Sequence, residues 1–209
     1  MKGATVSPRR ARRGYTSDAM NLLHRWACRS TGWGRLLESR IIPWTLEGVD
    51  LGEDALEIGP GPGLTTDVLR RQLPKLTCIE IDRRLADSLQ KRMAGTNSGV
   101  TVVHGDATQM SFPDGSFTGA VCFTMLHHVP SAERQDRLLA ETYRVLKPGA
   151  WFAGTDSRSS LRWRLYHVFD TCVPVDPDGF VSRPERAGFV EAAVDSNPWA
   201  FRFRARKPG

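Results

Sequence analysis

A run of alternating glycines gives the clearest chemical signal in the sequence. Gly59, Gly61 and Gly63 stand in the stretch LEIGPGPGLTT, after a short apolar run expected to form a strand at Ala55–Ile58 and before a stretch with helical spacing. Glycine lets a backbone turn sharply and pass close to a ligand, and the free N–H groups at a helix start attract hydrogen-bond acceptors. The pattern therefore predicts a ligand-binding turn between a strand and a helix.

The residues around these glycines argue against a dinucleotide ligand. The dinucleotide fingerprint places its third glycine where this chain has Leu64. Glu57 precedes Gly59 by two residues. A carboxylate at that place suits a ligand with a cationic amino group and repels a pyrophosphate.

Two more acidic residues follow apolar runs. Glu80, in the stretch IEID, is expected at the end of the second strand, where a carboxylate can accept hydrogen bonds from both hydroxyls of a ribose. Asp106, in the stretch GDA, is expected at the end of the third strand, where a short acid could accept from an exocyclic amine such as that of adenine. Taken alone, each residue is also typical of a solvated strand end or a common turn.

Short apolar runs alternate with helical periods from residue 53 onward, which is typical of an α/β fold with a parallel sheet and helices on both faces. Ligands bind at the carboxyl ends of the strands in such sheets, so the glycine-rich and acidic segments are expected to meet there. The expected helices cover residues 64–73, 84–94 and 132–146. The expected strands are Ala55–Ile58, Leu76–Ile81, Val100–His104, Gly119–Thr124 and Trp151–Thr155.

The flanking segments complete a single domain, expected over residues 20–209. Residues 20–48 have the pattern of an N-terminal helical cap, which Gly32 and Gly34 are expected to break into two pieces and Pro43 and Gly48 to end. Residues 50–156 are expected to form the core, and residues 157–209 an insert and the last strands. In that last part the pattern predicts a helix over 160–170, a loop over 173–179, a short helix at Ser182–Ala187 and an antiparallel pair at Val190–Ser196 and Ala200–Ala205.

Composition and charge exclude several classes of protein. The 209 residues are 40% hydrophobic and 25% charged, which excludes a disordered chain, and no apolar run is long enough for membrane insertion as a transmembrane helix. The four cysteines show no CxxC spacing, so neither a structural zinc site nor a redox dithiol is expected, and a reducing cytoplasm fits best. Residues 1–19 carry five basic side chains against one acid. They are expected to form a flexible basic arm that is either a solvated terminus or a binding segment for nucleic acid or another anionic surface.

Four stretches together resemble the class I S-adenosylmethionine-dependent methyltransferases, and most of all their small-molecule branch (methyltransferase type 11), which includes the quinone and sterol methyltransferases. The stretches are ALEIGPGPGLTT, CIEID, VVHGDATQMSFPDGSFTGAVCFTMLHHV and LLAETYRVLKPGAWF, and the resemblance spans residues 50–156. It implies a Rossmann-like, doubly wound sheet of seven strands that is mostly parallel with a final antiparallel strand. It also implies S-adenosylmethionine as cofactor and S-adenosylhomocysteine as product.

The resemblance assigns roles to individual residues. Glu57 and the backbone of the glycine turn would hold the methionine moiety, and the ends of the next three strands would hold the adenosine and the sulfonium. The turn residues are Gly59, Pro60, Gly61 and Gly63; the others are Glu80 at the ribose hydroxyls, Ile81 against the adenine, Asp106 and Ala107 at the adenine amine, and Thr124 and Met125 at the sulfonium end.

The glycine turn and the IEID and GDA stretches also resemble those of the ribosomal RNA adenine dimethyltransferases. Those enzymes carry an Asn-Leu-Pro-Tyr type motif after the fourth strand, which holds a flipped adenine. This chain has FTMLHH at residues 123–128 instead. RNA methylation guided by the basic arm is therefore the alternative function, and a non-catalytic cofactor-binding partner is the second alternative.

His127 and His128 follow the expected fourth strand, where the methyl group of the cofactor would emerge. An imidazole can take a proton from a hydroxyl or phenol as it is methylated, so both are candidates for a general base. The alternative is that one packs under the cofactor and the other caps a loop. Because methyl transfer from a sulfonium needs positioning more than it needs a base, an enzyme of this kind can also lack an essential base.

The predicted reaction is in-line transfer of the methyl group to oxygen or carbon of a small hydrophobic or phenolic acceptor. The acceptor pocket is expected to come from the N-terminal segment and from the insert after the fifth strand, although plain packing is the alternative role for both. No metal is expected, because the segment after the fourth strand has histidines and lacks the clustered Asp or Asn ligands of a catechol-type site. The candidate acceptor-binding residues are Tyr15, Asn21, His24, Trp26 and Tyr166.

Overall fold

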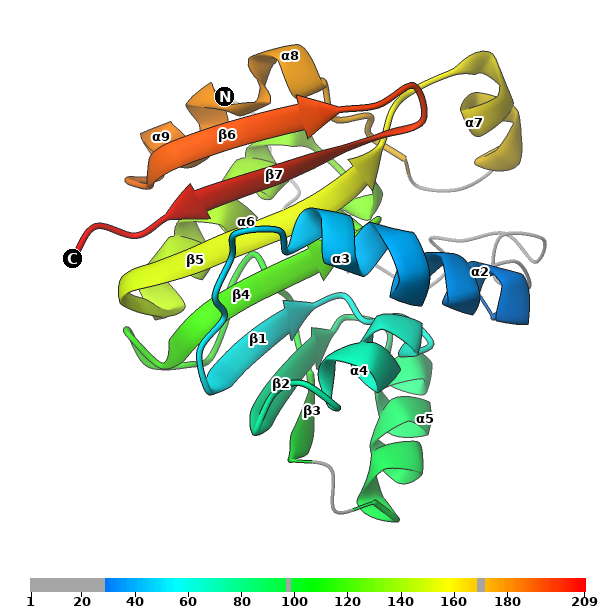
Figure 1. The fold of residues 1–209 in the computed structure, drawn as a ribbon, viewed down its shortest axis with the longest axis vertical. Helices are drawn as coiled ribbons and strands as arrows, with labels where there is room; N and C mark the ends of the chain where they lie inside the picture. The colour runs from blue at the N-terminus through cyan, green and yellow to red at the C-terminus, as the bar shows by residue number, and fades with distance from the viewer. Residues whose placement is uncertain (1–28, 97–98, 169–171) are drawn as a thin grey trace, which may run out of the picture.

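One sheet of seven strands runs through the part of the chain that the computed structural model describes, which is residues 29–96, 99–168 and 172–209 (Figure 1). The strands that lie next to one another among β1 to β5 run parallel, and β7 runs antiparallel to both β5 and β6. This arrangement confirms the expected fold class. The strands are β1 (Asp54–Ile58), β2 (Lys75–Glu80), β3 (Val100–His104), β4 (Phe117–Phe123), β5 (Leu146–Ser157), β6 (Val190–Ser196) and β7 (Ala200–Arg206), in the spatial order β3-β2-β1-β4-β5-β7-β6.

The strand order reverses direction beside β1. The chain moves outward from β1 through β2 to β3, then returns to place β4 on the other side of β1. The connections that leave the carboxyl ends of β1 and β4 therefore diverge to opposite sides. That divergence leaves a crevice at the carboxyl edge of the sheet, which is where ligands bind in doubly wound folds.

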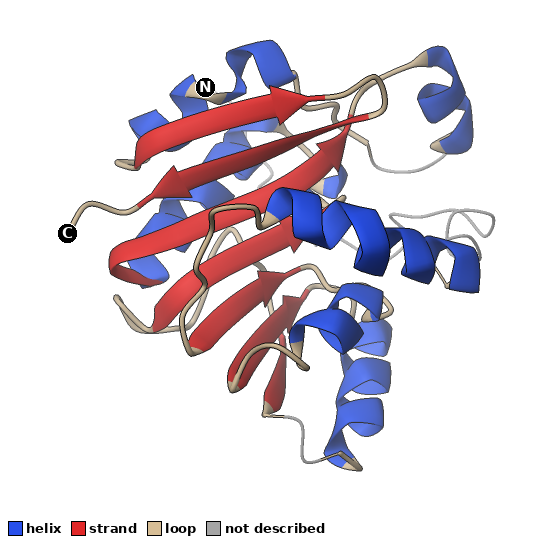
Figure 2. Cartoon of the chain, in the orientation of Figure 1, coloured by secondary structure: helices blue, strands red, loops and turns tan. Residues whose placement is uncertain are grey.

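Helices cover both faces of the sheet (Figure 2). One face packs against η1 (Leu37–Ile41), α3 (Ile42–Thr45), α4 (Leu64–Leu69) and α5 (Arg83–Ala94) in one buried apolar cluster. The other face packs against α6 (Ala132–Val145) and α8 (Pro177–Phe180) in a second cluster, and α9 (Ser182–Arg186) contacts α6 and β6 on that face. Because successive residues of a strand point to opposite faces, β1 divides its side chains between them: Ala55 belongs to the first cluster, and Leu56 and Ile58 to the second.

The N-terminal cap differs from its prediction. Helix α2 (Thr31–Leu36) passes through Gly32 and Gly34 without a break and continues through η1 and α3 to Thr45. Ser30 caps its start by accepting a hydrogen bond from the Trp33 N–H at 3.2 Å. The expected break at Gly32 and Gly34 does not occur, because a glycine inside a helix costs only about 1 kcal/mol, which capping and packing offset. The first of the two expected pieces lies outside the described residues. Residues 1–28, which include the predicted basic arm, lie outside the described residues.

Two boundaries in the second half also differ. Strand β5 begins at Leu146 and includes residues 147–149, which were expected only to stop the preceding helix; the pairing of Leu146 with Phe117 extends the strand in front of a bulge. Helix α8 lies in the expected loop at 173–179, where Asp176 accepts a hydrogen bond from the Asp178 N–H at 3.1 Å. The predicted antiparallel pair at the C-terminus is confirmed. Within the described ranges, no helix has the length and apolar character needed to cross a bilayer.

An ion pair on α6 fixes the connection between β3 and β4. The Glu141 carboxylate accepts hydrogen bonds from the Arg144 guanidinium at 2.9 Å and from the Met110 N–H at 2.7 Å. Arg144 also donates to the carbonyl oxygens of Met110 and Phe112. The guanidinium of Arg144 holds the pKa of Glu141 below its ordinary value.

We expect Glu141→Gln to lower the free energy of unfolding at pH 7 by about 1 kcal/mol, because one charge-assisted bond weakens and one acceptor is lost. A carboxyl with a lowered folded-state pKa stabilises the fold above its unfolded pKa, and this contribution disappears as the pH falls through the folded-state value. The difference between wild type and variant should therefore shrink in acid. Denaturant unfolding over a pH series measures it.

Glu133→Gln is the matched control, because Glu133 lies on the same helix in an exposed pair with Arg137. Such a pair contributes about 0.5 kcal/mol or less. Equal losses in the two variants, or a Glu141→Gln loss that does not change with pH, would contradict the proposed anchoring role of Glu141.

Candidate functional site

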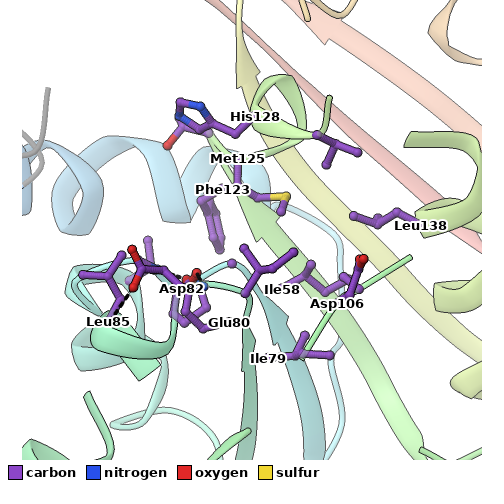
Figure 3. Close-up of a pocket in the computed structure, with 18 of the residues that line it drawn as sticks. Ile58, Ile79, Glu80, Asp82, Leu85, Asp106, Phe123, Met125, His128 and Leu138 are labelled. Carbon is purple, nitrogen blue, oxygen red and sulfur yellow. Dashed lines mark hydrogen bonds between the residues drawn. The ribbon is translucent and has the colours of Figure 1, made fainter. Parts of the chain in front are cut away.

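A cavity opens at the carboxyl ends of β1 to β4 (Figure 3). Figure 3 shows Met125 between His128 and Phe123 on one side of it, with Asp106 and Leu138 on another. Apolar side chains make up most of the lining, and a few acidic groups lie among them. The lining comprises Trp33, Leu37, Ile58, Gly59, Pro60, Gly61, Pro62, Leu64, Thr65, Ile79, Glu80, Ile81, Asp82, Leu85, Gly105, Asp106, Ala107, Thr108, Phe123, Thr124, Met125, His128, Val129, Pro130, Arg134 and Leu138.

The glycine turn after β1 requires glycine for two different reasons. Gly59, Gly61 and Gly63 all have positive φ, at 66°, 56° and 84°. A Cβ at Gly63 would lie 2.5 Å from Cδ1 of Leu89, because the turn packs directly on α5. Around Gly61 there is open space, so its bare backbone is left accessible from the cavity. Gly63 therefore serves packing, and Gly59 and Gly61 border the cavity.

Glu57 does not line the cavity, contrary to the prediction that it binds the ligand directly. Its buried carboxylate accepts hydrogen bonds from the hydroxyls of Thr65 and Thr66, the latter at 2.6 Å, and from the Cys78 thiol at 3.3 Å. Burial raises the pKa of Glu57. The structure thus assigns Glu57 to joining the end of β1 to the start of α4, and Gly63 likewise lies outside the lining.

Glu80 lines the cavity and also holds the glycine turn. One carboxylate oxygen accepts from the Gly61 N–H at 2.9 Å, and the other accepts from the Asp82 N–H at 2.9 Å. Burial raises the pKa of Glu80. Each carboxylate oxygen has a further lone pair, so Glu80 can accept two more hydrogen bonds from a ligand.

Asp106 is the second acidic residue that faces the cavity. Its Oδ1 accepts from the Thr108 N–H at 2.8 Å, and its Oδ2 lies 3.7 Å from the guanidinium of Arg134 on α6. The predicted neighbours Ile81 and Ala107 also line the cavity, which places apolar surface beside both acids. The arrangement suits a ligand with a flat apolar body and polar groups at its edges.

The turn after β4 is strained. Thr124 has a φ of 49°, which is rare for any residue other than glycine and more so for a β-branched one. Its N–H donates to the Thr155 carbonyl at 2.7 Å, which holds the turn against β5. Met125 packs tightly on Gly59: a Cβ added at Gly59 would lie 2.9 Å from Cε of Met125. Strain kept at such a place is a mark of functional sites.

The two predicted histidines have different environments. His128 borders the cavity, whereas His127 is buried behind it, and their ring centroids are 4.2 Å apart. Nδ1 of His127 bonds to the buried carboxylate of Asp156, which also accepts from the His127 N–H at 3.0 Å and the Ser157 N–H at 2.6 Å. Of these two histidines, only His128 can contact a ligand in the cavity without a rearrangement of the protein.

Sequence reasoning missed several residues of the site. Asp156 lies in β5 beside the end of β4, and the rule that ligands meet the carboxyl ends of strands would have found it. Trp33 and Leu37 of the N-terminal helix, and Arg134 of α6, come from other elements and carried no local signal. Among the predicted acceptor residues, Tyr15, Asn21, His24 and Trp26 lie outside the described residues. Tyr166 ends α7 (Leu161–Tyr166), and its side chain is also outside the described part.

Comparison with protein families places the cavity inside a known domain. Residues 56–154 match the family described as "Methyltransferase domain". These residues include the last three residues of β1, all of β2 to β4, most of β5 and every turn that borders the cavity at the carboxyl edge of the sheet.

Three similar proteins illustrate the range of relatives. The ribosomal RNA small subunit methyltransferase A of Novosphingobium aromaticivorans is 33% identical over 104 residues, 49% of this chain and 38% of that protein. The fatty-acid O-methyltransferase of Mycolicibacterium smegmatis is 33% identical over 107 residues, 51% of this chain and 38% of that protein. Phosphoethanolamine N-methyltransferase 2 of Haemonchus contortus, solved with S-adenosylhomocysteine, superposes with a TM-score of 0.69 at 15% identity over 81% of this chain and 52% of that one. The chain thus spans about two-fifths of the length of these two curated relatives.

We expect Gly63→Ala to lower the free energy of unfolding by about 2–5 kcal/mol. The left-handed backbone costs an alanine about 1–2 kcal/mol, and the clash with Leu89 adds an overpacking cost of about 1–3 kcal/mol. Gly61→Ala has the same kind of backbone and no neighbour to clash with, so it should cost only the backbone part. Denaturant unfolding of both variants measures the difference; equal losses would show that Gly63 does not pack on α5 as described.

Proposed function

Residues 56–154 of this chain belong to the class I S-adenosylmethionine-dependent methyltransferases, and from that premise we propose that the protein is an enzyme that methylates a small hydrophobic or phenolic molecule. The observation that carries the proposal is the cavity at the carboxyl ends of β1 to β4, where Glu80, Asp106 and His128 border a mostly apolar space. The cofactor is proposed to be S-adenosylmethionine, with S-adenosylhomocysteine as the product.

Glu80 is proposed to bind the ribose. Its two carboxylate oxygens each accept one backbone N–H, and each has capacity left for a ribose hydroxyl. Ile81 and Ala107 would pack on the adenine, and Asp106 would accept from its amine. The sulfonium end would then reach the turn at Thr124 and Met125. This order is supported by the position of all six residues in the lining of one cavity.

The methionine moiety is proposed to contact the backbone of Gly59, Pro60 and Gly61, which all line the cavity. Glu57 and Gly63 lie outside the lining, so we propose that they affect methionine binding only by holding the glycine turn in position. The acid that was expected to meet the amino group is therefore proposed as a positioning residue.

The proposed reaction is a direct displacement at the methyl carbon. The acceptor atom forms a bond to that carbon while the carbon–sulfur bond breaks, and its electron pair returns to sulfur, which becomes a neutral thioether. Since the sulfonium is already activated, the protein contributes mainly by aligning acceptor, methyl and sulfur. The strained turn at Thr124 would hold one side of that alignment.

His128 is the better candidate of the two histidines for a general base. It borders the cavity, so an acceptor hydroxyl could pass its proton to the ring as the new bond forms. His127, which was proposed alongside it, is buried behind it and bonded to Asp156. Its proposed role is to support His128 from behind rather than to touch the acceptor.

Two observations support a small acceptor over an RNA base. The lining of the cavity includes apolar groups such as Trp33, Leu37 and Phe123. The polar and aromatic motif that holds a flipped adenine is absent from residues 123–128. The curated relatives include both an RNA methyltransferase and a fatty-acid O-methyltransferase, and the apolar lining favours an acceptor of the second kind.

We expect Glu80→Gln to weaken the binding of S-adenosylhomocysteine at least about tenfold, because a charge-assisted hydrogen bond of about 1.5 kcal/mol or more is lost. Isothermal titration calorimetry measures it. Since burial raises the pKa of Glu80, the wild-type carboxylate gains a proton at a higher pH than an ordinary glutamate, and its affinity for the product should fall as the pH is lowered through that range. The Gln variant should lack this component of the pH dependence.

Glu53→Gln is the control, because Glu53 is an exposed residue just before β1 and does not line the cavity. It should bind the product with wild-type affinity. Equal affinities for Glu80→Gln and Glu53→Gln would show that the ribose site has been placed wrongly.

The acceptor class is tested by label transfer. The protein is incubated with methyl-labelled S-adenosylmethionine and host extract, and the RNA, protein, lipid and small-molecule fractions are separated. We expect label in the small-molecule or lipid fraction, with an initial rate at least about 100-fold lower for His128→Gln, as for loss of a general base.

His104→Gln is the matched control, because His104 is exposed at the end of β3 and should leave the rate unchanged. Label in RNA would overturn the proposed acceptor class. A cofactor-binding protein that labels no fraction would support the non-catalytic alternative. Wild-type labelling by His128→Gln would refute the base assignment.

A further inference from the structure

Three histidines gather at the edge of the cavity. One ring nitrogen from each of His127, His128 and His167 lies within 4.8 Å of the other two. His127 and His167 are buried, and His128 borders the cavity. The ring centroids of His127 and His167 are 5.1 Å apart, and the indole of Trp163 covers both rings, at 5.4 and 4.4 Å. His167 thus joins a histidine cluster with His127, although the two residues are 40 positions apart in the chain.

Asp156 sets the orientation and tautomer of His127. Its carboxylate accepts from Nδ1 of His127 and from two backbone N–H groups, so Nδ1 carries a proton and the lone pair of the neutral ring lies on Nε2. This Nε2 is buried and has no hydrogen-bond partner among the described residues. A buried nitrogen lone pair without a partner is unfavourable, and a bound ion would supply the missing partner.

His167 is oriented in a comparable way. Its Nδ1 lies 2.7 Å from the carbonyl oxygen of Trp163, one turn earlier in the chain. A carbonyl can only accept, so Nδ1 donates, and the lone pair of the neutral ring lies on Nε2. An oxygen acceptor on one ring nitrogen is the usual partner of a histidine whose other nitrogen binds a metal.

We propose that His127, His128 and His167 form a binding site for a divalent transition-metal ion such as Zn²⁺. Imidazole nitrogen is a preferred ligand of zinc, and three histidines with one open position form a known catalytic zinc geometry. In a tetrahedral site the ligand nitrogens lie about 3.3 Å apart. The three rings are therefore within about 1.5 Å of the required separation, which small side-chain rotations can supply. Asp156 would partly balance the charge of the ion from behind His127.

The proposed metal site differs from the expectation, made from the sequence, that no metal binds. That expectation considered acidic ligands directly after the fourth strand, whereas this cluster uses two histidines there and a third that directly follows α7. Plain aromatic packing is the competing explanation, but packing alone requires neither the orphaned Nε2 of His127 nor the acceptors on both Nδ1 atoms.

The site would also narrow the acceptor, a step that rests on the proposed function. His128 borders the cavity beside Thr124 and Met125, so the open position of the ion would face the place where the methyl group emerges. A divalent ion there would bind an acceptor oxygen and favour its deprotonated form. The proposed acceptor is then a hydroxyl, phenol or carboxylate compound that is methylated on oxygen.

Metal binding to the full chain tests the proposal directly. The purified protein is stripped with EDTA, dialysed, and titrated with ZnCl₂ in competition with a chromophoric chelator, and Co²⁺ replaces Zn²⁺ for visible spectroscopy. We expect one tight Zn²⁺ per chain and a tetrahedral Co²⁺ spectrum. His167→Gln and His128→Gln should each weaken zinc binding by more than about tenfold, and Asp156→Asn, an outer partner, by about 10–100-fold.

His104→Gln is the matched control and should bind zinc as the wild type does. A wild-type protein that retains no zinc against the chelator would overturn the proposal. So would equal zinc affinities in His167→Gln and His104→Gln, because the metal would then bind elsewhere. Since His167 lies on the peripheral helical segment after β5, its variant is expected to fold, and a thermal melt checks this.

Titration with S-adenosylhomocysteine separates this proposal from the proposed function. Zinc binding is measured without cofactor or acceptor, and product binding is measured on zinc-free protein. Zinc binding without product binding would refute the methyltransferase proposal alone. Product binding without zinc binding would refute the metal site alone. Full label transfer by EDTA-stripped protein would refute the catalytic role of the ion, leaving His128 as a free base.

Discussion

Two buried carboxylates hold the glycine turn on which the cavity depends. Glu57 at the end of β1 joins the hydroxyls of Thr65 and Thr66, and Glu80 at the end of β2 joins the Gly61 N–H. A buried carboxylate without such partners would be strongly unfavourable, so each acid specifies the position of the backbone around it. The raised pKa values of both groups show the cost of their burial. The hydrogen bonds of Glu57 and Glu80 thus hold the glycine turn from behind, and its backbone remains accessible from the cavity.

The division of the sheet at β1 brings together residues that are distant in sequence. The ends of β1, β2 and β3 supply the glycine turn, Glu80 and Asp106 on one side of the crevice. The ends of β4 and β5 supply Thr124, His128 and Asp156 on the other. The side with glycines and acids suits the cofactor. The side with histidines is where we propose that the acceptor binds.

The order of strands and helices in the core could be predicted from the sequence because the signals were local. Buried parallel strands appear as apolar runs, and the turns after them contain glycine or a short acid, so Glu80, Asp106 and the glycines were found in place. The direct role expected of Glu57 finds no support in its position, because sequence spacing does not reveal which way a strand-end side chain points: here it meets Thr65 and Thr66 under the turn. The continuous N-terminal helix and the meeting of Asp156 and His167 with His127 depend on packing between distant segments, for which the sequence has no local signal.

Hydrogen–deuterium exchange with and without S-adenosylhomocysteine tests the central claim most directly, because it locates the ligand on the chain without any substitution. A cofactor in this cavity should slow exchange over residues 59–63, 80–82 and 105–108 and around 124–128, with no change over the β6–β7 pair at the far edge of the sheet. Unchanged exchange in all four of these segments at saturating ligand, or protection confined to other parts of the chain, would contradict the assignment of this cavity as the cofactor site.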